Sequence, residues 1–273
     1  MAKFIERLDN AASSNRSLLS IGIDPAPSSM PIDDIAAFTT AIIEATSDLV
    51  CAYKPQMAFF EAEGIAGLRA LEATIRAIPS NIPIILDAKR GDIGNTSAAY
   101  AKAAFEVWGA DAITVSPYMG TDSVDPFTAY SDRGVFVLTR TSNPGGADFE
   151  DKLLVDSNEP LYIEVTRRAI QWNSHGNVGL VVGATTPDEL TRVRDICGDM
   201  PILIPGIGAQ GGDLESSISN GVDRHGRRAI INVARGVIYA SSGADFAEAA
   251  RREATQIRDN INTELDRLGY PWE

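Results

Sequence analysis

Short apolar runs alternate along the chain with longer segments whose apolar residues recur at helical spacing. Continuous apolar runs, rather than alternating ones, are typical of strands in a parallel sheet that is buried on both faces. The runs that predict strands are residues 18–23, 51–53, 83–86, 112–115, 135–138, 178–182, 202–204 and 229–233. The segments that predict amphipathic helices are residues 35–49, 66–78, 97–108, 161–172 and 246–268.

Eight strand candidates separated by helical segments predict an α/β fold, a (β/α)8 TIM barrel, with residues 1–273 forming a single domain. The length agrees, because such barrels have about 250 residues. The structural alternative is an open, doubly wound sheet. No Gly-x-Gly-x-x-Gly motif follows the first predicted strand, which favours the barrel.

Charge and composition narrow the class of partner. A formal net charge of −13 argues against a nucleic-acid-binding surface and favours a small ligand held in a locally positive pocket. The N-terminus lacks the apolar core of a signal peptide, and no apolar run is long enough to cross a bilayer, so we expect a soluble cytoplasmic protein. Cys51 and Cys197 lack zinc-site spacing and are expected to be buried, reduced thiols.

The run DAKRGD at positions 87–92 directly follows the apolar run 83–86. On a strand, Asp87 and Lys89 point to the same face and can pair, whereas Asp92 lies beyond the strand. Ionised groups without partners are costly to bury, so the run indicates a preorganised charge array. The alternative is purely structural: an Asp87–Lys89 ion pair, with Asp92 capping a helix that begins near residues 95–97.

Other predicted strands also end in polar residues. Because the active sites of TIM barrels lie at the carboxyl ends of the strands, Asp24, Lys54, residues 139–145 and Arg235 are candidates as well. The glycine-rich segment PGIGAQGG at 205–212 and the Ala-Arg-Gly at 234–236 predict a phosphate site after strands seven and eight. Alternatively, these glycines form ordinary turns and Arg235 is a surface cation.

Several of these motifs together resemble the orotidine 5′-phosphate decarboxylase family, in particular its longer bacterial branch. They are GIDP at 22–25, DAKRGDIGNT at 87–96, TSNPG at 141–145, PGIGAQGG at 205–212, and Arg235. The resemblance spans nearly the whole chain. It implies a carboxy-lyase that converts orotidine 5′-monophosphate to UMP and CO2 in pyrimidine biosynthesis, with no metal and no organic cofactor.

The same resemblance implies roles for the charge array. Lys89 would donate the proton to C6, Asp87 would face the substrate carboxylate, and Lys54 would hold Asp87 and a ribose hydroxyl. Asp92 and Thr96 would enter the site from the other subunit of a homodimer.

The remaining implied contacts are with substrate. Asp24 would bind the ribose and Ser142 the pyrimidine. Gln210 and Arg235 would bind the phosphate.

Two rival functions stay open on the sequence. A metal-dependent sugar-phosphate decarboxylase or aldolase on the same barrel would need an acidic Mg²⁺ ligand at the end of strand two, where this chain has Lys54. A nucleotide-phosphate sensor would keep the pocket without turnover. We expect no catalytic role for His175, His225 or Arg90. Residues 143–156 form a candidate mobile lid. Residues 223–228 are expected to be an insertion relative to shorter members of the family.

Overall fold

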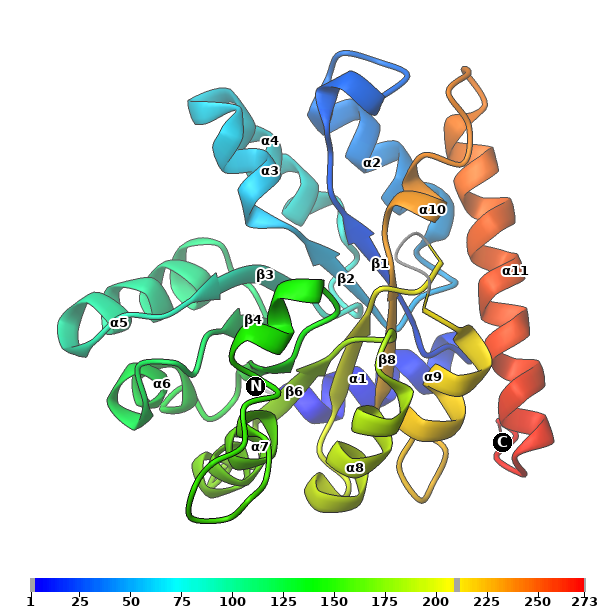
Figure 1. Cartoon of the computed structure of the whole chain (residues 1–273). Coiled ribbons are helices and arrows are strands. Elements are labelled where there is room, and N and C mark those ends of the chain that lie inside the picture. Colours follow the sequence, from blue (N-terminus) through cyan, green and yellow to red (C-terminus); the bar gives the residue numbers. More distant parts are fainter. Residues whose placement is uncertain (1–2, 209–211, 273) are drawn as a thin grey trace.

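Eight parallel strands form the centre of the molecule in the computed structural model, which describes residues 3–208 and 212–272 (Figure 1). Their order in the sheet is β2-β1-β8-β7-β6-β5-β4-β3. The strands are β1 (Leu19–Ile23), β2 (Ala52–Pro55), β3 (Ile85–Arg90), β4 (Ala112–Val115), β5 (Gly134–Arg140), β6 (Val178–Val182), β7 (Ile202–Pro205) and β8 (Ala229–Val233). Parallel bridges between Tyr53 and Ile84 and between Gln56 and Asp87 join β2 to β3, which closes the barrel.

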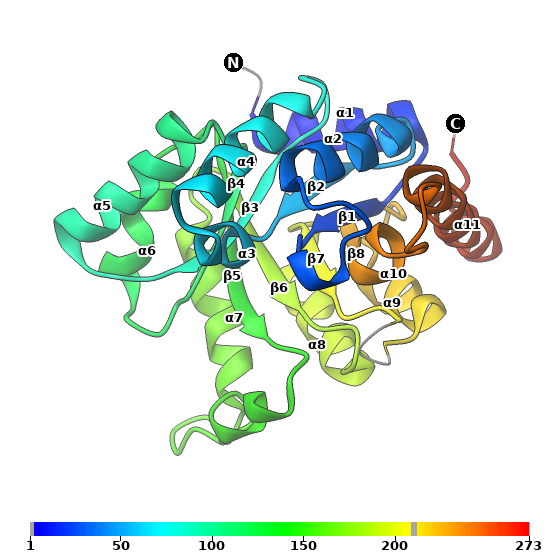
Figure 2. The ribbon, with the colours of Figure 1, turned by 90° about the horizontal axis from the view of Figure 1, so that it is seen from above.

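Helices surround this barrel, as the view from above shows (Figure 2). The α-helices are α1 (Phe4–Asn15), α2 (Ile35–Thr46), α3 (Met57–Ala62), α4 (Gly64–Ala77), α5 (Gly94–Lys102), α6 (Thr121–Thr128), α7 (Leu161–Trp172), α8 (Pro187–Cys197), α9 (Leu214–Gly221), α10 (Arg235–Ile238) and α11 (Phe246–Arg267). The short helical turns are η1 (Pro27–Ser29), η2 (Ala103–Val107) and η3 (Pro144–Asp148). No helix in the described ranges is long and apolar enough to span a bilayer.

The strands are buried on both faces, with successive side chains alternating between two apolar clusters. Along β5, Phe136 points into the barrel, whereas Val135 and Val137 pack on the surrounding helices. Helix α1 covers the amino-terminal end of the barrel and inserts Phe4, whose ring meets Phe136 edge to face at 5.7 Å. A Cβ at Gly134 would lie 2.5 Å from the Phe4 ring, so glycine is required there. The opposite end of the barrel is therefore left for the site.

The structure confirms the predicted barrel and all eight strands, with shifted boundaries. Strand β3 continues through the charged run to Arg90 instead of ending at residue 86, because hydrogen bonding to β4 resumes after an irregularity. The helix expected at 97–108 begins earlier, at Gly94, and its last turn is the π-helical η2. Helices α1, α3, α6, α8, α9 and α10 were not predicted, since most are short or have only a narrow apolar face.

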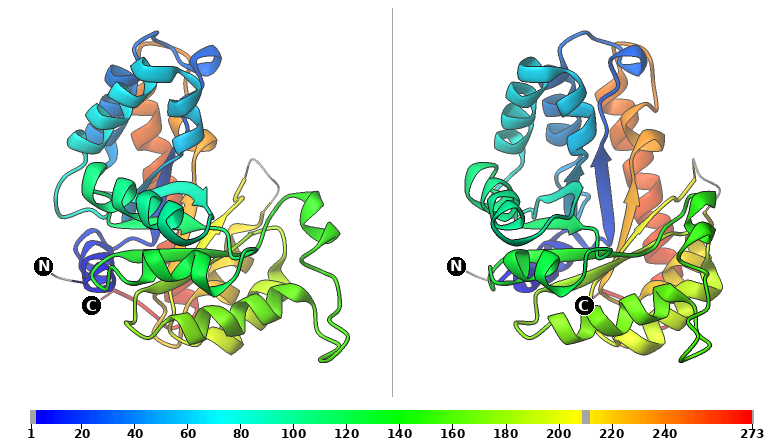
Figure 3. Two further views of the ribbon diagram at one scale, coloured as in Figure 1. Left: turned by 90° about the vertical axis from the view of Figure 1, so that its left-hand side faces the viewer. Right: turned by 60° about the vertical axis from the view of Figure 1, so that its left-hand side comes forward.

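Two irregular segments flank the barrel at opposite ends. The segment 143–156 follows β5, contains η3, and projects from the body in the green part of the ribbon (Figure 3). The segment 223–228 lies beside α1 and the C-terminal residues: Arg228 pairs with Asp9, and the Arg227 guanidinium lies 3.7 Å from the Trp272 ring centre. This segment therefore contacts both α1 and the C-terminal residues, far from the carboxyl ends of the strands.

Candidate active site

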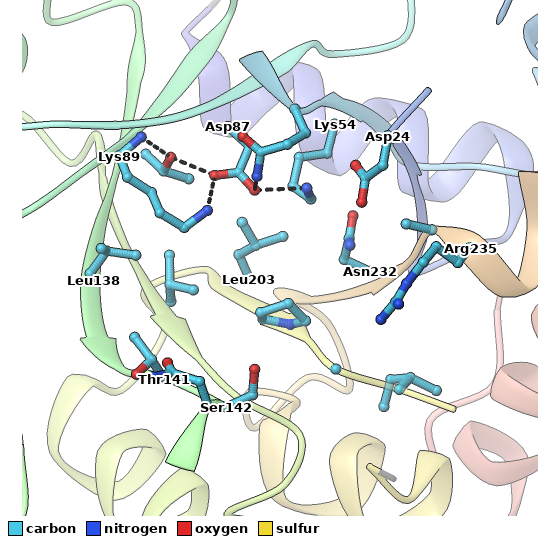
Figure 4. A pocket seen from close by; sticks show the side chains of 18 of the residues that line it. Asp24, Lys54, Asp87, Lys89, Leu138, Thr141, Ser142, Leu203, Asn232 and Arg235 are labelled. Atoms are coloured by element: carbon cyan, nitrogen blue, oxygen red, sulfur yellow. Dashed lines mark hydrogen bonds and ion pairs between the residues drawn. The ribbon is translucent and has the colours of Figure 1, made fainter. Parts of the chain in front are cut away.

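A cavity of about 290 Å³ opens at the carboxyl ends of the strands (Figure 4). All eight strands contribute residues, either from the strand itself or from the loop after it. The lining residues are Asp24, Lys54, Gln56, Asp87, Lys89, Thr114, Leu138, Thr141, Ser142, Asn143, Val181, Leu203, Pro205, Gly206, Ile207, Asn232, Ala234, Arg235 and Gly236. One side is thus strongly charged, while the floor is apolar.

The Asp87 carboxylate is the centre of the charged side. Its Oδ2 accepts hydrogen bonds from Lys54 Nζ at 2.8 Å and Gln56 Nε2 at 3.0 Å. Its Oδ1 accepts from Lys89 Nζ at 2.6 Å and Thr114 Oγ1 at 3.0 Å. Both oxygens are fully engaged, so the predicted array of Lys54, Asp87 and Lys89 is assembled within one chain.

Burial and charge oppose each other at this carboxylate. Desolvation alone would raise the pKa of Asp87, but Lys54 and Lys89 hold its pKa well below the usual range. Desolvation would likewise lower the pKa of Lys54, and the attraction of Asp87 and Asp24 outweighs it, so the pKa of Lys54 is raised. The side chain of Lys89 is 47% exposed and that of Lys54 only 5%. Lys89 is therefore the ammonium group that an incoming ligand can reach.

Asp24 lies on the other side of Lys54 with an unsatisfied oxygen. Its Oδ1 is buried and accepts no hydrogen bond from any residue that the structure describes. Desolvation raises the pKa of Asp24. An orphaned buried acceptor that lines a cavity is suited to a hydroxyl donor from a ligand.

Two polar lining residues were not singled out from the sequence: Thr114 and Asn232. Thr114 and Asn232 lie inside apolar strands, where a lone polar residue on the barrel-facing side is the signal that could have found them. The buried Asn232 receives a hydrogen bond from Ser20 Oγ at 3.3 Å and lies between Asp24 and Arg235 (Figure 4).

The far end of the cavity is formed by the turns after β7 and β8. Gly206 has a φ of +103°, which favours glycine, and Gly212 packs so closely on the Gly206 carbonyl that a Cβ would lie 2.6 Å from its oxygen. Arg235 begins α10 and also lines the cavity. Gln210, predicted at this end, lies outside the described residues.

Asp92 and Thr96 do not line the cavity of this chain. The alternative in which Asp92 caps the following helix is wrong, because the N-cap of α5 is Ile93. Asp92 Oδ1 instead accepts a hydrogen bond from the adjacent Ile93 N–H at 2.8 Å. Arg90 points away from the site, pairs with Glu61 and lies over Tyr100, as predicted. His175 and His225 are likewise not among the lining residues.

The residues present do not suit a metal centre. Lys54 places a buried ammonium at the end of β2, where the metal-dependent rival needs a carboxylate, and a cation there repels a divalent ion. Within residues 3–208 and 212–272, no three His, Cys, Asp or Glu side chains converge as a metal site. Both cysteines are buried and free, as expected.

Comparison with known proteins decides the family. Residues 17–252 match the family described as "Orotidine 5'-phosphate decarboxylase / HUMPS family". The chain belongs to this family. An orotidine 5′-phosphate decarboxylase of Herpetosiphon aurantiacus is 54% identical, over 92% of this chain and 95% of that protein. That of Thermomicrobium roseum is 52% identical, over 94% of each chain.

A solved structure agrees with these family members. The Leishmania donovani OMP decarboxylase superposes with a TM-score of 0.84 at 42% identity, covering 96% of this chain and 98% of that one. The resemblance inferred from the motifs is therefore confirmed, and so is the barrel.

Proposed function

We propose that this cavity decarboxylates orotidine 5′-monophosphate to UMP and CO2, with Lys89 as the proton donor to C6. The overall reaction rests on membership of the family and on nearly full-length relatives at 52% and 54% identity that are named as this carboxy-lyase. The roles of individual residues are supported by one observation above all: Lys54 and Lys89 bind opposite oxygens of Asp87 on the charged side of the cavity.

The chemistry requires a preplaced cation. Loss of CO2 from C6 leaves an electron pair on a ring carbon that has no adjacent group to delocalise it. An ammonium group beside C6 stabilises that developing charge and then supplies the proton that forms the new C–H bond. Lys89 is suited to both steps, because Asp87 fixes its Nζ at 2.6 Å while much of its side chain stays open to the cavity.

Asp87 acts on the substrate carboxylate. Lys54 and Lys89 keep Asp87 ionised, so a second carboxylate beside it is repelled until it leaves as neutral CO2. Binding of the distant phosphate offsets this repulsion. Lys54, which is buried, positions Asp87 and also reaches a ribose hydroxyl.

The rest of the cavity matches the rest of the nucleotide. Asp24, with its orphaned Oδ1, accepts a ribose hydroxyl. Ser142 binds the pyrimidine from the end of β5, and Arg235 binds the phosphate together with backbone N–H groups after β7. Gln210 is assigned to the phosphate by the motif alone. No step of this scheme calls for a metal or an organic cofactor.

The partner that completes the site is a second copy of the chain. Asp92 directly precedes the N-cap of α5 and Thr96 lies in the first turn of this helix, and both would reach the partner's cavity. Large apolar side chains are exposed on neighbouring loops: Ile93 at 51%, Tyr118 at 82% and Met119 at 47%. Such a patch is typical of an interface, and it supports a homodimer with Asp92 and Thr96 shared across it.

We place this reaction in the cytoplasm, which the two free, buried thiols suit. The direct test follows the loss of orotate absorbance when orotidine 5′-monophosphate is mixed with the protein, with and without EDTA. We expect equal turnover in both. Turnover abolished by EDTA and restored by Mg²⁺ would favour the metal-dependent rival, whereas tight nucleotide binding with no change in absorbance would favour the sensor.

A further inference from the structure

The segment 143–156 is fastened to the end of β5 through two carboxylates: Asp151 binds Arg140 alone, whereas Glu150 binds both Arg140 and Thr141. Glu150 Oε2 accepts hydrogen bonds from the Thr141 N–H at 2.9 Å and Arg140 Nη1 at 2.9 Å, and Glu150 Oε1 accepts from Thr141 Oγ1 at 2.7 Å. The Arg140 side chain is 9% exposed and that of Glu150 is 21% exposed. These bonds are therefore largely shielded from solvent, which strengthens them.

Glu150 is itself held in place. Its backbone N–H donates to the Gly146 carbonyl at 2.8 Å, and its carbonyl accepts from Tyr162 N–H in α7 at 3.1 Å. A Cβ on Gly146 would lie 2.7 Å from Glu150 Oε2 and 2.6 Å from Arg140 Nη1, so the turn packs directly on the ion pair. The projecting segment is thus anchored to the end of β5 at Glu150.

The residues that Glu150 holds lead directly into the cavity. Thr141 and Ser142 both line it. On the other side, the Gly183 N–H donates to the Arg140 carbonyl at 2.8 Å and Thr185 Oγ1 donates to the Ser142 carbonyl at 3.2 Å. The end of β5 therefore lies between the loop after β6 and Glu150, and among the described residues only Glu150 binds both the N–H and the hydroxyl of Thr141.

We infer that Glu150 is a positioning residue for substrate: by binding Thr141 and Arg140, it sets the place of Ser142 at the pyrimidine end of the cavity. This inference rests on the proposed function, which assigns the pyrimidine to Ser142. Glu150 does not line the cavity and needs no contact with the ligand. Its effect should fall on recognition of the base and spare recognition of the phosphate, since Arg235 lies at the opposite end (Figure 4).

The test measures binding of UMP and of ribose 5-phosphate, by titration calorimetry, to Glu150→Ala, Glu150→Gln and Asp151→Ala. Asp151 is the matched control, because Arg140 Nη2 donates to it at 3.2 Å but it has no bond with Thr141. We expect Glu150→Ala to raise the Kd for UMP by about tenfold or more and to leave the Kd for ribose 5-phosphate within about twofold of the wild-type value. Glu150→Gln keeps an oxygen acceptor and should recover most of the loss, and Asp151→Ala should stay within about threefold for both ligands.

Two results overturn the inference: UMP binding that is unchanged in Glu150→Ala, or an equal loss for UMP and ribose 5-phosphate, which would indicate general damage to the barrel. The outcome is separable from that of the proposed function. A wild-type protein that binds UMP but fails to decarboxylate orotidine 5′-monophosphate contradicts the function, while the comparison of the two ligands still decides the role of Glu150.

Discussion

Lys89 donates to Asp87 Oδ1 at 2.6 Å from a left-handed backbone, with a φ of +46°. This conformation costs a residue with a side chain about 1–2 kcal/mol. Thr114 offsets that cost, because its hydroxyl accepts from the N–H groups of Ala88 at 3.0 Å and Lys89 at 2.9 Å. The same hydroxyl donates to Asp87 Oδ1, so one side chain from β4 fixes both partners of the ion pair.

Thr114→Val should therefore impair the site, although valine has nearly the volume of threonine. It leaves two backbone N–H groups without their acceptor, at a cost of about 1–3 kcal/mol, and frees Asp87 and Lys89 to move. We expect kcat to fall by about tenfold to a hundredfold. Thr114→Ser keeps the hydroxyl and should stay within about threefold of wild type, so equal activity of the two variants would rule out this role.

Asp24 should reduce stability at neutral pH. Because burial raises its pKa, the folded protein binds this proton more tightly than the unfolded chain, and stability falls as pH rises above the ordinary carboxyl pKa of about 4. Asp24→Asn should stabilise the protein at pH 7 by about 1 kcal/mol, or about 2–4 °C in Tm, while weakening nucleotide binding.

Thermal unfolding between about pH 4 and pH 8 checks this sign, since the advantage of Asp24→Asn should shrink toward the acidic end. Asp33→Asn, at an exposed position, serves as the control. An advantage that is absent at neutral pH, or independent of pH, would show that the carboxylate is well accommodated.

Arg194 stabilises the amino-terminal end of the barrel. Its buried guanidinium donates to the Gly221 carbonyl at 2.9 and 2.6 Å and to the Met200 carbonyl at 2.8 Å, close to the ends of α8 and α9. Arg194→Met leaves these carbonyls unsatisfied and should cost about 2–4 kcal/mol, measured by denaturant unfolding, with kcat unchanged. Arg224→Met removes an exposed pair with Asp199 and an exposed hydrogen bond to the adjacent His225, and should cost less than about 0.5 kcal/mol. Equal losses would contradict the role of Arg194.

Much of this architecture could be predicted from the sequence, for physical reasons that differ between elements. Strand β6 coincides with its predicted range because a run of five fully buried apolar residues has no competing pattern. The pairing of Asp87 with Lys89 was predicted from strand alternation, but it is achieved by the irregular end of β3 and the left-handed Lys89. The sequence near Lys89 does not predict this irregularity, because the Lys89 N–H is held by Thr114, which lies 25 residues further along the chain.

Residues that act through long-range contacts were the hardest to predict. Glu150 reads as one of several acidic residues in a polar loop, and only the fold brings its carboxylate to Thr141. Thr114 and Asn232 each lie within an otherwise apolar strand, so the pattern around them indicates core packing and not a site. By contrast, Lys54 was a candidate because it follows a predicted strand, and the family resemblance implied its pairing with Asp87, which the structure contains.

The proposed sharing of Asp92 can be tested by mixing subunits. Asp92→Asn and Lys89→Ala chains should each form inactive homodimers, but a hybrid dimer has one site with intact Lys89 from the first chain and intact Asp92 from the second. Random exchange makes about half the dimers hybrid, so about a quarter of wild-type activity per site should return. If Asp92 served its own chain, every site would keep one lesion, and verified exchange would restore nothing.

The most direct measurement for the whole account is the turnover of orotidine 5′-monophosphate by Lys89→Ala. Lys89 lies at the rim of the cavity and makes few apolar contacts, so the variant should fold, with a Tm close to that of wild type and ribose 5-phosphate binding retained. We predict that kcat falls by more than about a thousandfold, since both the cation at C6 and the proton source are lost. A kcat within about tenfold of wild type, a barrier change of only about 1.4 kcal/mol, would contradict the central role of Lys89.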